Sequence, residues 1–148
     1  MIRQKARYLL DVNAVLALLD PQHLFHDAVH RWGDANPEAL WLMCPLVQNG
    51  VLRVASQPRY PNSPGPVTVV RELLRAFAAH PRHEFVHDSV SMLDDAVSNP
   101  GFITPATVTD AYLLLLAERS GAKLATFDRR MPVGAISGGA SLVERIPV

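Results

Sequence analysis

Short apolar runs alternate with longer segments of helical periodicity along most of the chain. The apolar runs predict strands over residues 8–10, 40–43, 84–86 and 123–127, and they allow a fifth strand over residues 142–145. Apolar positions that recur every three or four residues predict helices over residues 15–19, 25–35, 45–56, 67–79, 90–97 and 104–120. Strands separated by helices are typical of a parallel sheet covered on both faces, so we expect an α/β fold, a three-layer α/β/α sandwich.

One proline-rich segment interrupts this pattern. Residues 57–66 (QPRYPNSPGP) contain four prolines, and neither a helix nor a sheet tolerates that density of missing amide donors. The parts of the chain on either side are too short to make convincing separate domains, and 148 residues are a usual length for one domain. We therefore expect a single domain over residues 1–148 with residues 57–66 as an inserted loop.

Composition and charge exclude several classes of protein. Hydrophobic residues make up 49% of the chain, which is too many for a disordered protein. Fourteen Lys and Arg balance fourteen Asp and Glu, so a nucleic-acid partner would need a local basic patch. The single cysteine, Cys44, excludes an intrachain disulfide, and no apolar run approaches the ~20 residues of a membrane span. Asp11 interrupts the first apolar stretch too early for a secretory signal, so we expect a cytoplasmic protein with no membrane partner.

Acidic side chains follow two of the predicted strands at their carboxyl ends. Asp11 comes directly after the first strand and Asp128 directly after the fourth. Asp110 lies in the second turn of the last long helix, and Gln48 lies in the first turn of the helix after the second strand. Both helices should leave the same edge of the sheet, so we expect all four side chains to converge there. Three crowded carboxylates raise one another's pKa, a cost that a hard divalent cation such as Mg²⁺ removes.

A metal site of this kind is suited to phosphodiester cleavage. A divalent cation can bind a phosphate oxygen, lower the pKa of a water and stabilise the leaving oxygen. Asn13 and Thr126 each lie two residues from a key aspartate, where they are suited to orienting a carboxylate or a water. Arg53, Arg129 and Arg130 are candidates for contacts with nucleic-acid phosphates. Each of the three acids also has a structural alternative, as a helix cap, a partner of the helix dipole or a turn residue.

Four segments carry a resemblance to a known family. They are residues 9–16 (LLDVNAVL), 44–53 (CPLVQNGVLR), 109–114 (TDAYLL) and 124–129 (LATFDR). In this order and spacing they resemble the PIN-domain ribonucleases, in particular the VapC toxins of bacterial toxin–antitoxin pairs. The resemblance implies a PIN-like sandwich, a Mg²⁺- or Mn²⁺-dependent endoribonuclease that cleaves RNA, a homodimer and a cognate VapB antitoxin. It also implies that Asp11 and Asp110 bind the metal, that Asp128 completes the acidic site, and that Asn13 and Thr126 fill supporting polar positions.

The chain departs from this family at Gln48, where a glutamate is usual. An amide can still orient a water, but it carries no charge, so we expect weaker metal binding and a Gln48→Glu variant that binds Mn²⁺ more tightly. A catalytically weakened PIN-fold module, which binds RNA or an antitoxin without cutting, therefore stays an alternative function. A small phosphatase is a weaker alternative, because Asn13 stands where phosphatases of the haloacid dehalogenase type carry a second acid.

Overall fold

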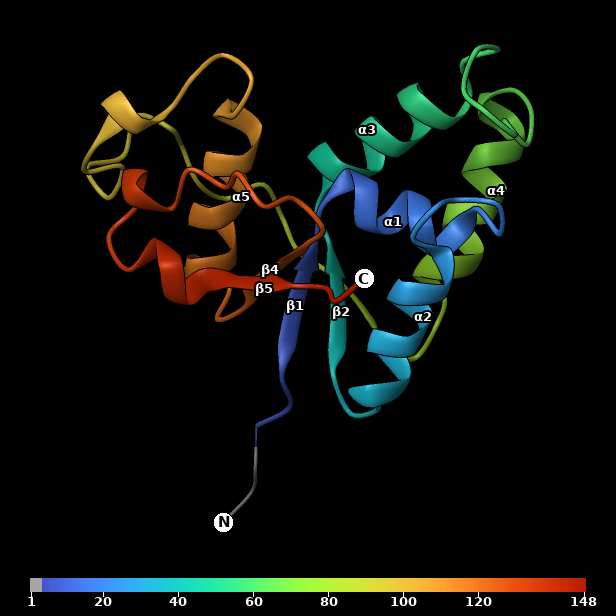
Figure 1. The fold of residues 1–148 in the computed structure, drawn as a ribbon, viewed down its shortest axis with the longest axis horizontal. Coiled ribbons are helices and arrows are strands. Elements are labelled where there is room, and N and C mark those ends of the chain that lie inside the picture. Colours follow the sequence, from blue (N-terminus) through green and yellow to red (C-terminus); the bar gives the residue numbers. More distant parts are fainter. Residues whose placement is uncertain (1–3) are drawn as a thin grey trace.

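The computed structural model describes residues 4–148 and places a sheet of five parallel strands at the centre (Figure 1). The strands are β1 (Arg7–Leu10), β2 (Leu40–Met43), β3 (His83–Phe85), β4 (Lys123–Thr126) and β5 (Val143–Arg145). Their order across the sheet is β3-β2-β1-β4-β5, and every neighbouring pair is parallel. The strand predictions are therefore confirmed to within one residue at each end.

Helices cover both faces of this sheet. The α-helices are α1 (Val12–Leu19), α2 (His26–Ala35), α3 (Pro45–Ala55), α4 (Val67–Ala78) and α5 (Val108–Arg119), and the short 3-10 helices are η1 (Pro100–Phe102), η2 (Val133–Ala135) and η3 (Gly139–Leu142). Figure 1 shows α1 to α4 on one side of the strands and α5 with the C-terminal 3-10 helices on the other. Right-handed crossovers give this arrangement for this strand order. The three-layer α/β/α sandwich is confirmed.

The helix predicted over residues 90–97 is wrong. This segment forms turns, because two of its side chains bind the backbone locally. The Leu93 amide donates to Ser91 Oγ at 3.1 Å, and the Ala96 amide donates to Asp94 Oδ1 at 2.8 Å. Such short-range bonds offer the backbone an alternative to helical hydrogen bonding. The apolar spacing alone therefore overestimated the helical content here.

The last long helix begins later than the sequence pattern predicts. Residues 104–107 form a turn in which the Thr104 amide donates to Thr107 Oγ1 at 2.9 Å, and α5 starts at Val108. Asp110 therefore lies in the first turn of α5 rather than the second. The change brings its carboxyl closer to the helix N-terminus, at the edge where β1 and β4 end.

The hydrophobic core fixes the position of α5. Four consecutive leucines, Leu113–Leu116, are each no more than 1% exposed, so the helix is enclosed on nearly all sides. A helix that is apolar all round is stable only when it is buried in this way. None of the helices between residues 4 and 148 has the length and apolarity needed to cross a membrane.

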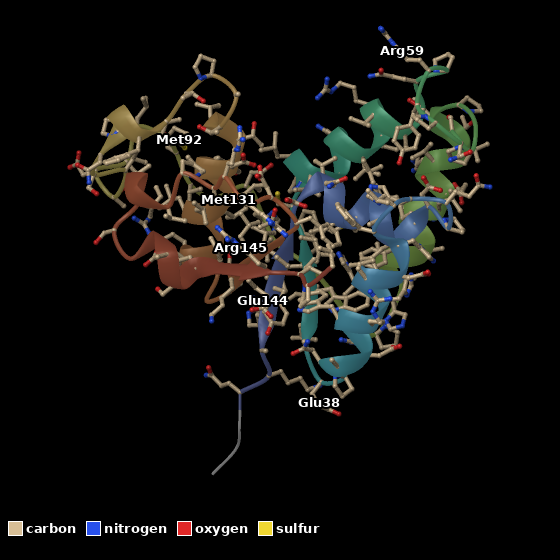
Figure 2. All side chains as sticks on the ribbon, in the orientation of Figure 1. Glu38, Arg59, Met92, Met131, Glu144 and Arg145 are labelled. Carbon is tan, nitrogen blue, oxygen red and sulfur yellow. The ribbon has the colours of Figure 1, made fainter. Side chains whose placement is uncertain are left out.

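The proline-rich loop joins α3 to α4 and consists of turns, as predicted. Its Tyr60 hydroxyl donates to Asp20 Oδ2 at 3.2 Å, which ties the loop to the end of α1. The loop tip, marked by Arg59 in Figure 2, lies well away from the C-terminal strand that carries Arg145.

Candidate active site at the carboxyl edge of the sheet

Asp11 is both a helix cap and a pocket residue. It follows β1 as the N-cap of α1, and its Oδ1 accepts a hydrogen bond from the Ala14 amide at 2.8 Å. Its Oδ2 accepts from Thr126 Oγ1 at 2.6 Å, and the residue is only 7% exposed. Burial raises the pKa of this carboxyl above its ordinary value, the two hydrogen bonds oppose the rise, and the charge of Asp128 adds to it.

Thr126 connects the two strand ends that carry the acids. It is the last residue of β4 and is fully buried. Its Oγ1 donates to Asp11 and accepts from the Asp128 amide at 3.0 Å. The side chain of Asp128 in turn binds the backbone two residues further along, because its Oδ1 accepts from the Arg130 amide at 2.8 Å. The hydroxyl therefore orients one carboxylate and positions the backbone of another.

Asp110 reaches the same place from α5, on the opposite face of the sheet from α1. Its carboxyl is half-buried, and its pKa is raised to about 6. Burial is the main cause, followed by the negative charges of Asp128 and Asp11. The three acids are therefore close enough to repel one another electrostatically.

A pocket of about 410 Å³ collects these acids at the carboxyl edge of the sheet. Its lining consists of Asp11, Val12, Asn13, Phe25, Thr109, Asp110, Leu113, Phe127 and Asp128. The pocket draws on four separate stretches of the chain, and the parallel sheet brings them together because the ends of β1 and β4 are neighbours. The expectation that Asp11, Asp110 and Asp128 converge at this edge agrees with this geometry, whereas Gln48, the fourth side chain expected there, is not part of the lining.

Comparison with known proteins decides the family. The family model of the PIN domain matches residues 8–135 of this chain. The chain belongs to the PIN-domain family. Ribonuclease VapC44 from Mycobacterium tuberculosis is 43% identical over 135 residues, which are 89% of this chain and 93% of that protein. Ribonuclease VapC38 from the same species is 41% identical over 120 residues, 81% and 84% of the two chains.

A solved structure supports the same fold. A chain in the crystal structure of VapBC2 from Rickettsia felis, bound to a DNA fragment from their promoter, aligns with a TM-score of 0.61. The alignment covers 95% of this chain and 99% of that one at 13% identity, so it supports the fold alone. The resemblance drawn from the four sequence segments is confirmed at the level of the family.

The acids of this PIN domain share a pocket without forming a closed metal shell. Within residues 4–148, no three His, Cys, Asp or Glu side chains are grouped so that they could hold one ion. That Asp11, Asp110 and Asp128 together surround one cation stays a prediction. Asp128 is exposed, its Oδ1 is engaged by the Arg130 amide, and repulsion among the acids favours their separation.

The donor set nevertheless fits a hard divalent cation. Mg²⁺ usually takes only one or two protein carboxylates and keeps several waters, and Mn²⁺ accepts similar oxygen ligands. Asp11 and Asp110 can supply those carboxylates. Burial is the main cause of the raised pKa of Asp110, and the like charges of Asp128 and Asp11 that add to it are charges that a cation in the pocket would neutralise.

Gln48 lies outside the lining of this PIN-domain pocket. It is half-buried in the first turn of α3, which approaches α1 closely at Gly50. A methyl group added at Gly50 would meet Val12 Cγ2 at 2.6 Å, and Val12 itself lines the pocket. Arg53, further along α3, is exposed and also lies outside the lining.

Arg129 and Arg130, which follow Asp128, differ in what they contact. Arg130 is exposed and contributes its backbone amide to Asp128. Arg129 is also exposed, and it lines a neighbouring hollow of about 290 Å³ together with Phe127 and Arg145. Arg145 was not predicted from the sequence, where it appears only as the end of a short strand.

Asn13 is fixed by a histidine that sequence analysis did not connect with it. His23 Nδ1 accepts from the Phe25 amide at 3.0 Å, so the proton of the neutral ring is on Nε2. That nitrogen lies 3.0 Å from Asn13 Oδ1 and donates to it. Burial lowers the pKa of His23, which favours the neutral ring. The turn between α1 and α2 is therefore tied directly to the pocket.

Proposed function

We propose that this PIN-domain protein is a divalent-metal-dependent endoribonuclease, the toxin of a VapBC-type toxin–antitoxin pair. The observation that carries this proposal is the pocket that Asp11, Asp110 and Asp128 line together, where burial and then the charges of the other two acids raise the pKa of Asp110 to about 6. Relatives of 43% and 41% identity that are named ribonucleases support the same class of reaction.

In this proposal two of the three acids bind the cation, and the third completes the acidic site. Asp11 and Asp110 hold a Mg²⁺ or Mn²⁺ ion, and Asp128 adds negative charge at the rim. When bound, the cation neutralises phosphate charge and lowers the pKa of a bound water. Thr126 keeps the Asp11 carboxylate in one orientation, and His23 holds Asn13 at the pocket wall.

The proposed partners follow from the same family. The relatives named ribonucleases support RNA as the substrate. A VapB-type antitoxin as the inhibitor is what the resemblance to VapC toxins implies. We further propose a homodimer, the assembly that the resemblance to VapC toxins implies. A phosphatase of the haloacid dehalogenase type is not proposed, because the chain belongs to a different family.

Cleavage of RNA with defined metals tests this function. We expect the purified protein to cut total bacterial RNA at a small set of sites in Mn²⁺ or Mg²⁺, with no cutting in EDTA and recovery when Mn²⁺ is added in excess. Sequencing of the new 5′ ends locates the sites. Cleavage that persists in EDTA, or turnover of p-nitrophenyl phosphate with intact RNA, would contradict the proposal.

Gln48 favours a second candidate, a PIN-fold module that binds RNA or an antitoxin without cutting. We expect Gln48→Glu to tighten Mn²⁺ binding by up to about tenfold, because an added carboxylate on α3 attracts a cation in the pocket through space, even from outside the lining, by up to about 1.4 kcal/mol. Calorimetric titration with Mn²⁺ measures this, and Gln57→Glu adds the same charge to the proline-rich loop as a control. Unchanged affinity would place Gln48 outside the reach of the ion. RNA cleavage that appears only in Gln48→Glu would favour the binding module.

A further inference from the structure

The acidic pocket has an aromatic wall that hydrolysis of a phosphodiester does not require. Phe25 and Phe127 both line the pocket and are half-buried, so neither side chain is fully enclosed by the core. The two rings stack with centroids 4.6 Å apart and planes 25° from parallel. Apolar surface left in contact with water costs free energy, and a flat apolar ligand would recover it.

Local hydrogen bonds hold both rings at the pocket. The Phe25 amide donates to His23 Nδ1, and the same His23 ring binds Asn13 on the pocket wall. Phe127 lies between Thr126 and Asp128, whose side chain and backbone are linked by a hydrogen bond. The same polar contacts that fix the site therefore also fix the aromatic pair.

Phe127 separates the acidic pocket from a cationic hollow. It lines both, and in the second it is joined by Arg129 and Arg145. Arg145 Nη2 donates to the Arg129 carbonyl at 3.0 Å, which places its guanidinium beside the hollow. Figure 2 shows Arg145 beside β5 near the middle of the molecule. The surface thus presents a metal-compatible pocket, an aromatic surface and a basic hollow in sequence.

This sequence of surfaces matches the chemistry of a single-stranded RNA. We propose that Phe25 and Phe127 form a stacking site for one unpaired RNA base next to the scissile phosphate, and that Arg129 and Arg145 bind the neighbouring phosphate. The proposal rests on the endoribonuclease function above. Aromatic side chains stack on any base, and a base paired inside a duplex cannot reach them. The preferred substrate is therefore a single strand or a loop, with its base turned onto Phe127.

Abasic RNA tests the stacking site directly. The substrate is an oligonucleotide spanning a mapped cleavage site, and its matched versions lack the base at one position on either side of the cut. We expect loss of the base at one of these positions to lower the kcat/KM of the wild-type protein about tenfold. Phe127→Leu should lower kcat/KM on intact RNA by the same factor and leave the abasic substrate unaffected, because the two changes remove one interaction. Phe127→Tyr should retain cleavage, and Phe102→Leu, at an exposed phenylalanine outside the pocket, is the control.

The outcomes separate the stacking site from the nuclease itself. Normal cleavage of every abasic substrate would overturn the stacking site and leave the nuclease in place, as would an equal loss for Phe127→Leu on intact and abasic RNA. If no RNA is cut in the presence of metal, the endoribonuclease proposal fails. Binding of RNA that carries 2-aminopurine to the Mn²⁺-loaded protein then tests the stacking site on its own. Fluorescence quenching that Phe127→Leu abolishes supports stacking, and unchanged fluorescence overturns it. Loss of antitoxin binding with normal RNA binding in Phe127→Leu would assign the rings to a protein partner instead.

Discussion

An Asp110→Asn variant is expected to lose RNA cleavage by a hundredfold or more and yet to have a more stable metal-free fold than the wild type at neutral pH. Asp110 is one of two carboxylates proposed to hold the cation, and even groups that only support a metal ligand are worth about 10- to 100-fold. The same carboxylate is half-buried beside two other acids, so its charge destabilises the protein when no cation is present.

The pH dependence of this effect has a definite sign. The pKa of Asp110 is about 6 in the folded protein and 3.8 in its ordinary state, so the folded protein binds the proton more tightly. The stability this contributes is complete below pH 3.8 and is lost as the pH rises through about 6. The shift is worth about 3 kcal/mol for a fully buried group, and solvent screening of a half-buried one reduces it to about 1–2 kcal/mol.

Urea unfolding in EDTA at pH 4.5 and at pH 7.5 measures the difference. Asp110→Asn should exceed the wild type in free energy of unfolding by about 1–2 kcal/mol at the higher pH, with a much smaller gap at the lower pH. Added Mn²⁺ should stabilise the wild type and leave the variant almost unchanged. Asp95→Asn, at an exposed carboxylate outside the pocket, should show neither effect. A gap that does not depend on pH would contradict this account.

Replacing Thr126 by valine should weaken both the fold and the reaction. Valine keeps the shape of the buried side chain, but Asp11 loses a donor at 2.6 Å and the Asp128 amide loses an acceptor at 3.0 Å. Buried groups left without partners cost about 1–3 kcal/mol each, so we expect unfolding to become easier by about 2–3 kcal/mol. The pKa of Asp11 should rise further, because the lost hydrogen bond lowers it in the wild type.

Thr126→Ser separates the hydroxyl from the methyl group. Serine retains both hydrogen bonds and loses one buried methyl, for which about 1 kcal/mol is expected. Chemical unfolding of the three proteins and the pH profile of RNA cleavage provide the two readouts. Thr126→Val should shift the profile towards higher pH, and Thr126→Ser should leave it in place. Equal pH profiles for the two variants would contradict the role assigned to the hydroxyl.

The strands and the convergence of the acids could be predicted from local pattern and from one topological rule. The strands are short apolar runs, and parallel strands place their carboxyl ends at one edge, so Asp11 and Asp128 had to be neighbours once β1 and β4 were adjacent. The turns at residues 91–97 could not be predicted in the same way. Their apolar spacing resembles that of a helix, and only the hydrogen bonds of Ser91 and Asp94 decide against it.

The aromatic wall and the basic hollow were beyond sequence analysis for a different reason. Phe25 and Phe127 are far apart in the chain, and neither belongs to a motif that implies the other. Phe25 has the spacing of an ordinary core residue at the start of α2. Arg145 gains its place only from the pairing of β5 with β4. Such tertiary pairings leave no local signal in the sequence. The position of Phe127 between Thr126 and Asp128 was the one feature that could have marked it as a candidate pocket residue.

The basic hollow has a practical consequence for how the protein is prepared. Pro147 and Val148 line this hollow beside Arg129 and Arg145. An affinity tag fused after Val148 would therefore cover the surface that we propose for RNA. Arg7 begins β1 at the amino ends of the parallel strands, opposite the carboxyl ends that hold the pocket, so a fusion on the N-terminal side is the better choice. Activity assays should therefore use the upstream fusion, and a C-terminally tagged sample would underestimate the affinity for nucleic acid.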